Sequence, residues 1–130
     1  MRAGPVSDLA GMLAGMAPLL DARRWAFAVT GGAPPEDAFA IIREDEGTTA
    51  IVPDPAGDFA RITLTVHSAL DGVGLTAAVA TALAERGIAC NVVAGFHHDH
   101  LFVPWERAEE AVRALAALST GAAAGEGPSA

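Results

Sequence analysis

Hydrophobic and polar residues alternate most regularly in the middle of the chain. Over residues 61–67 every second position is apolar, which predicts a strand with one face against a core. Over residues 75–86 a bulky apolar side chain recurs every four positions, and this spacing predicts a helix that ends at Gly87. Residues 88–94 and 100–103 are apolar runs of the length typical of strands.

The flanking regions predict further elements. Pro104 opens an amphipathic stretch that predicts a final helix over residues 105–118. Residues 119–130 contain no bulky residue and predict a disordered tail. The N-terminal part predicts a helix, a strand and a two-stranded hairpin, which cover Leu9–Leu20, Trp25–Val29, Ala38–Arg43 and Thr48–Val52.

The order of these elements indicates an α+β fold. From residue 59 the chain reads strand–helix–strand–strand–helix, which is a ferredoxin-like βαββαβ unit that lacks one strand. We expect residues 25–29 to supply that strand, so that two incomplete units complete one another. The Pro- and Gly-rich run at 53–58 then separates an N-terminal half, 1–58, from a C-terminal unit, 59–118.

Charge and cysteine content exclude several classes of partner. Eight basic residues, all Arg, face sixteen acidic ones, and the formal net charge is −8. Neither nucleic acid nor an anionic membrane is an expected partner, because both require clustered cations. The apolar run at 9–20 is too short to span a bilayer and lacks a cleavage site, so we expect no export. The single cysteine, Cys90, fits a reducing, cytoplasmic compartment.

Residues 72–77, Gly-Val-Gly-Leu-Thr-Ala, form a glycine-rich turn before a helix. They match the GxGxxA pattern of dinucleotide-binding proteins. However, the preceding strand alternates instead of being apolar throughout, and four residues separate it from the first glycine. Two interpretations remain: the glycines only permit a tight turn, or their exposed amides hold a ligand carboxylate.

Other polar residues give weaker signals. His98 and His100 have the H-x-H spacing of a metal pair, but the sequence offers no clear third ligand, so a turn that leads into a strand is the simpler explanation. Cys90 is expected on the core side of its strand, with Ile88 and Val92, as an inert thiol. Since nucleophile, base and oxyanion donors are not assembled anywhere, we expect neither catalytic residues nor a cofactor.

Three motifs together resemble the ACT domain, in particular the small bacterial proteins that carry two such units in tandem. They are the Asp-Gly-Val-Gly turn at 71–74, the Gly-Ile-Ala-Cys-Asn strand at 87–91 and the Asp-His-Leu-Phe-Val-Pro strand at 99–104. Residues 44–53 resemble the first half of the same family, so the likeness extends from Leu9 to about Leu118.

The resemblance implies a non-catalytic regulatory protein that binds an amino acid or a similar small polar ligand, and a homodimer or higher homo-oligomer. The ligand would contact Asp71, Gly72, Val73, Gly74, Asn91, Val93, Ala94 and Asp99. The glycine amides suit a carboxylate and Asp71 or Asp99 an ammonium group. Because the N-terminal half lacks the Asp-Gly-x-Gly turn, we expect one site per chain, or one completed by a second chain. The alternatives are a ligand-free scaffold that uses sheet edges and a metal-dependent hydrolase built on His98 and His100.

Overall fold

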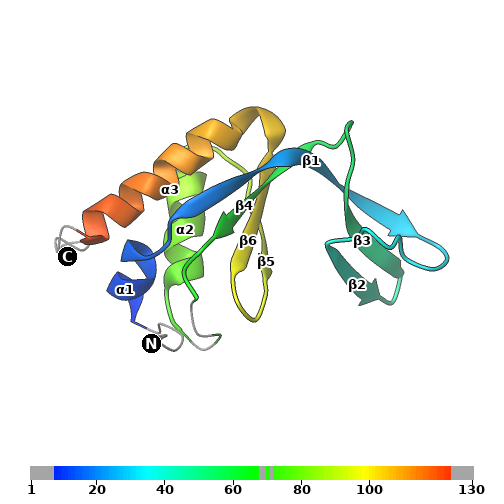
Figure 1. Cartoon of the computed structure of the whole chain (residues 1–130), viewed down its shortest axis with the longest axis horizontal. Coiled ribbons are helices and arrows are strands. Elements are labelled where there is room, and N and C mark those ends of the chain that lie inside the picture. Colours follow the sequence, from blue (N-terminus) through cyan, green and yellow to red (C-terminus); the bar gives the residue numbers. More distant parts are fainter. Residues whose placement is uncertain (1–7, 68–69, 71, 124–130) are drawn as a thin grey trace.

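The computed structural model describes residues 8–67, 70 and 72–123. Their strands form one antiparallel sheet in the order β2-β3-β1-β4-β6-β5 (Figure 1). The elements are α1 (Leu9–Ala14), β1 (Pro18–Thr30), β2 (Ala40–Glu44), β3 (Gly47–Pro53), β4 (Phe59–Leu64), α2 (Leu75–Ala84), β5 (Asn91–Ala94), β6 (Asp99–Pro104), a 3-10 turn η1 (Trp105–Arg107) and α3 (Ala108–Ala123).

The C-terminal unit has the predicted ferredoxin-like arrangement. Its strands lie in the order β4-β6-β5, and β1 from the N-terminal half pairs with β4 as the fourth strand. The missing strand therefore comes from the N-terminal half, as predicted, but its bounds differ: residues 18–25 lie along β4, and of the predicted residues 25–29 only Trp25 pairs with β4 while the others pair with β3. The hairpin of β2 and β3 is also confirmed, with Glu44 opposite Gly47 at its turn.

Two predicted helix boundaries are wrong. The first helix ends at Ala14 instead of Leu20, because the chain turns at Gly15 and enters β1 at Pro18. The turn contains Ala17 with φ 38°, a left-handed conformation that few non-glycine residues adopt. The last helix runs on to Ala123, so residues 119–123, which we predicted to be disordered, are helical, and residues 124–130 lie outside the described part.

The larger core lies between the helices and one face of the sheet (Figure 1). Alternate residues of β4 point into it, as the sequence pattern predicts, and α2 contributes side chains at the predicted four-residue spacing. Its largest members, each at most 4% exposed, are Met12, Leu13, Met16, Ile62, Leu64, Leu75, Val79, Leu83, Ile88, Leu101, Val103 and Leu115.

A second, aromatic cluster covers part of the opposite face, where only one buried face was expected. Trp25, Ile51 and Phe102 are at most 1% exposed, and Phe39, Phe59 and Val93 pack around them. The rings of Trp25, Phe39 and Phe102 meet edge to face, with centroids 5.7–6.1 Å apart. This cluster attaches the β2–β3 side of the sheet to β6.

The loop between β3 and β4 crosses closely over β1 at Gly57. A Cβ atom built on Gly57 would lie 2.3 Å from the carbonyl oxygen of Trp25, so only glycine fits there. We expect Gly57→Ala to lower the free energy of unfolding by at least about 2 kcal/mol, because backbone must move apart. Urea denaturation followed by tryptophan fluorescence measures this change. Gly31→Ala, where a Cβ meets nothing within 4 Å, is the matched control and should leave stability nearly unchanged.

Candidate ligand-binding site

The predicted glycine turn lies at the start of α2. Gly74, which has no side chain, is the N-cap residue with φ 103°, and no side chain of a described residue caps this end of the helix. A Cβ on Gly74 would come within 3.3 Å of the methyl groups of Leu9, so the turn packs closely against α1. Val73 is 81% exposed, and Asp71 lies outside the described residues. An uncapped first turn presents amides that can bind an anion.

The hairpin residues of the predicted site are only partly brought together. Ala94 pairs with Asp99, which pairs in turn with Leu64, the last residue of β4. Asp99 and Ala94 therefore lie at the end of the sheet from which the chain continues toward Gly72. Asn91 lies at the other end of β5, about 10 Å from Ala94, where its side-chain amide donates to the Phe102 carbonyl. Val93 packs in the aromatic cluster.

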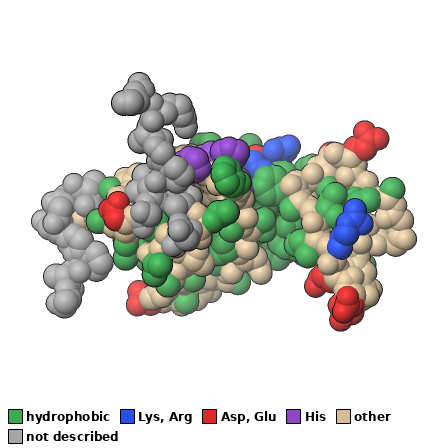
Figure 2. Space-filling view, turned by 90° about the horizontal axis from the view of Figure 1, so that it is seen from below, with side chains coloured by type: hydrophobic (Ala, Val, Ile, Leu, Met, Phe, Trp, Pro, Cys, Tyr) green, Lys and Arg blue, Asp and Glu red, His purple; other side chains and the backbone are tan. Residues whose placement is uncertain are grey.

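The histidines do not assemble a metal centre in the described part of the chain. No group of three His, Cys, Asp or Glu side chains there is placed to hold a metal ion. His67, His97 and His98 gather beside Phe96 at the exposed end of the hairpin (Figure 2). His100 is separate: its Nδ1 lies 2.9 Å from Thr63 Oγ1 and its ring packs on Phe39. Burial, helped by the nearby Arg61 and His98, lowers the pKa of His100.

Cys90 is half-buried and packs against the larger core together with Val92. Burial raises the pKa of its thiol. A raised pKa leaves little thiolate at neutral pH, which supports the prediction of an inert side chain.

An ionic network lies on the same face of the sheet as the aromatic cluster. The guanidinium of Arg61 is sandwiched between two rings, 4.7 Å from the centroid of Trp25 and 4.5 Å from that of Phe39. It donates to Asp21 at 2.9 Å, and Arg23 binds the same carboxylate through two nitrogens at 3.0 Å. Stacking between rings while binding a carboxylate requires a planar guanidinium, which lysine cannot supply.

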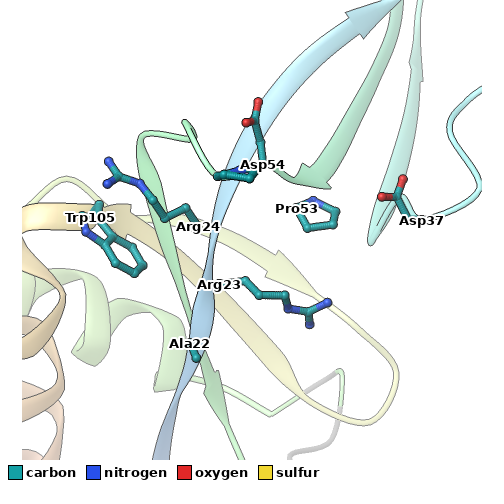
Figure 3. Close-up of a pocket in the computed structure, with 8 residues that line it drawn as sticks. Ala22, Arg23, Arg24, Asp37, Pro53, Asp54 and Trp105 are labelled. Atoms are coloured by element: carbon teal, nitrogen blue, oxygen red, sulfur yellow. The ribbon is translucent and has the colours of Figure 1, made fainter.

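A cleft of about 620 Å³, which was not predicted from the sequence, lies beside β1 (Figure 3). It combines two arginines and two aspartates with an indole and two prolines. No sequence pattern assigned a binding role to Trp105 or to the adjacent pair Arg23 and Arg24, and that pair was the only signal available. The lining residues are Ala22, Arg23, Arg24, Asp37, Pro53, Asp54, Pro55 and Trp105.

The fold and this polar surface define the class of protein: a small α+β sandwich of the ferredoxin-like type. Comparisons with known proteins identify the family. Models of the ACT domain match residues 60–117 and 5–68. The chain is similar to a structure from Vibrio cholerae described as a protein of unknown function and possible transport protein, at 40% identity. That match covers 85% of this chain and 95% of the other, with a TM-score of 0.74.

More distant structures have the same fold. A protein from Agrobacterium tumefaciens is 23% identical over 73% of this chain and 81% of its own, with a TM-score of 0.57. The ligand-free regulatory subunit of aspartate kinase from Thermus thermophilus is 15% identical over 81% of this chain and 97% of its own, with a TM-score of 0.63. The search of curated proteins found no match.

The chain therefore belongs to the ACT-domain family. This membership supports a regulatory, ligand-binding role in general terms. Within the described residues, no helix is both long and apolar enough to cross a membrane.

The Asp21 network predicts a specific dependence of stability on pH. Hydrogen bonds from the Arg23 side chain are the main cause that lowers the pKa of Asp21 from 3.8 to about 2; burial opposes the shift, and the Arg23 amide and the Arg61 charge add to it. The folded state therefore favours the ionised carboxyl. The stabilisation of the folded state by the ionised Asp21 is complete above the pKa that this carboxyl has in the unfolded chain, 3.8. This stabilisation is lost as the pH falls through the folded-state pKa of about 2.

We expect Asp21→Asn to lower the free energy of unfolding by roughly 1 kcal/mol at pH 7, a value reduced for solvent screening at the exposed Arg23. The difference from the unsubstituted protein should shrink between pH 4 and pH 2 in urea titrations. Asp45→Asn, in the exposed turn between β2 and β3, provides the control. A difference for Asp21→Asn that stays constant over this pH range would contradict the assignment.

Proposed function

We propose that this protein is a non-catalytic regulator that binds an amino acid. The ligand carboxylate would bind the amides of Gly72, Val73 and Gly74 at the start of α2, and its ammonium group would bind Asp99. The observation that carries this proposal is the uncapped, left-handed turn at Gly74 in a chain of the ACT family. Charge-assisted hydrogen bonds each contribute about 1.5–3 kcal/mol, so a few of them support micromolar binding.

The roles of the remaining predicted residues are also proposals. Ala94 would border the ligand beside Asp99, since the two residues pair at the end of the hairpin. Asp71 would offer a second carboxylate. Asn91 and Val93 would contact the ligand from a second copy of the chain. Within one chain, Asn91 lies at the end of β5 that is distant from Asp99, and Val93 packs in the aromatic cluster.

We further propose that the protein acts as a homodimer or higher homo-oligomer in the cytoplasm. Both β2 and β5 are edge strands, so each can pair with another copy of the chain. A single, half-buried cysteine of raised pKa suits a reducing compartment. Binding of the amino acid would transmit a signal by altering how copies of the chain associate with one another.

A thermal-shift panel of the twenty amino acids tests the proposed binding. A ligand at one hundred times its dissociation constant adds about 2.7 kcal/mol, which raises the melting temperature by about 10 °C for a domain of this size. We expect at least one amino acid to produce such a shift. We also expect Asp99→Asn to abolish the shift, because a neutral amide cannot pair with the ammonium group.

Glu109→Gln, on the exposed side of α3, is the matched control and should respond like the unsubstituted protein. If no amino acid raises the melting temperature, the protein is a scaffold without an amino-acid ligand. If Asp99→Asn folds and still responds fully, the amino acid binds elsewhere.

A further inference from the structure

The cleft shown in Figure 3 lies far from the proposed amino-acid site. Asp99 is the first residue of β6, whereas Trp105 directly follows its last residue, Pro104. Six residues of extended chain place them about 20 Å apart, at opposite ends of the strand. The cleft is therefore a separate site, and what it binds does not depend on the amino-acid proposal.

Arg24 is held in a fixed orientation at one end of the cleft. Its Nε donates to the carbonyl oxygen of Gly57 at 2.7 Å, and its guanidinium lies 4.8 Å from the centroid of the Trp105 ring. Among the described residues its two terminal nitrogens have no hydrogen-bond partner and no ion pair. A positioned guanidinium with both terminal nitrogens free is suited to bind a carboxylate through two hydrogen bonds.

The other three charged groups of the cleft are not equivalent. Arg23 already uses two nitrogens on Asp21, and Asp54 accepts a hydrogen bond from the amide of Ala56. Asp37 makes no hydrogen bond or ion pair with any described residue, and it lies across the cleft from Arg24 and Trp105 (Figure 3). The guanidinium of Arg24 and the carboxylate of Asp37 thus lie at opposite ends of the cleft, with the apolar ring of Pro53 between them (Figure 3).

The edge of β1 is open beside this cleft as far as Arg23. Strand β3 begins to pair with β1 only at Trp25, and the carbonyl oxygen of Arg24 accepts a hydrogen bond from the amide of Asp54 at 2.9 Å, so no described strand pairs with residues 18–23 on that side. The register of β1 against β4 is also irregular between Leu20 and Arg24, and Ala22, within this bulge, is exposed and lines the cleft. An open strand edge can form main-chain hydrogen bonds with an extended peptide.

We infer that this cleft binds a short peptide with free termini. The C-terminal carboxylate binds Arg24, the N-terminal ammonium group binds Asp37, and an apolar side chain packs on Trp105 and Pro53. A volume of about 620 Å³ lies in the range of small-ligand sites. Because Pro53 lies between Arg24 and Asp37, a ligand that reaches both must extend past that ring, which favours a peptide over a single amino acid, whose charges are only a few bonds apart (Figure 3).

Isothermal titration calorimetry with the tripeptide Ala-Leu-Ala tests this inference on the full chain. We expect binding, and a loss of affinity of about ten-fold or more when the peptide carries a C-terminal amide or an N-terminal acetyl group. Arg24→Gln should weaken binding of the free peptide to a similar extent. It should have little further effect on the amidated peptide, because the two changes remove the same interaction.

Asp37→Asn should likewise lower the affinity for the free peptide and leave the affinity for the acetylated peptide unchanged. A matched control, Arg113→Gln on the exposed side of α3, should bind Ala-Leu-Ala normally. No binding at millimolar peptide, equal affinity for free alanine or leucine, or additive losses for Arg24→Gln and amidation would each overturn the inference. Since the peptides can be modified without changing the protein, the result does not depend on the variants folding.

Discussion

The structure depends on one long strand, β1, that joins the two parts of the sheet. The thirteen residues of β1 pair with β4 over their first half and with β3 over their second. Trp25 is the point of exchange, because its Cα partners are Phe59 on one side and Pro53 on the other. Its ring, 1% exposed, packs on Phe39 and Phe102. Without β1 the C-terminal unit lacks its fourth strand and the β2–β3 hairpin has no sheet to join.

Patterns that arise within one element could be read from the sequence. The alternation of β4, the four-residue spacing of α2 and the hairpin turn at Gly47 depend on neighbours along the chain, and all three are present. The end of α1 was not readable in this way. Met12, Leu13 and Met16 are all buried although the helix stops at Ala14, so burial spacing alone did not distinguish a helix from a helix followed by a turn.

The second core and the cleft could not be predicted, because they depend on contacts between residues distant in the chain. Phe39 meets Phe102 only after the sheet curls, and Trp105 meets Arg24 only because the loop at 54–58 crosses β1. The glycine turn before α2 is different, since its residues are consecutive. The glycine turn could therefore be recognised in the sequence as a candidate site, whereas the cleft could not, although more charged side chains line the cleft.

The network at Asp21 connects the curl of the sheet to the cleft. Arg61 extends from β4 between the rings of Trp25 and Phe39. Asp21 accepts a hydrogen bond from Arg61 and also binds Arg23, which lines the cleft. Asp37 precedes Phe39 by two residues, so one short segment carries both a carboxylate that lines the cleft and a ring of the aromatic cluster. A ligand that bridges Arg24 and Asp37 would bind only the curled form of the sheet. By linkage, the proposed ligand would stabilise the form in which the β2–β3 hairpin is joined to the rest of the sheet through the aromatic cluster.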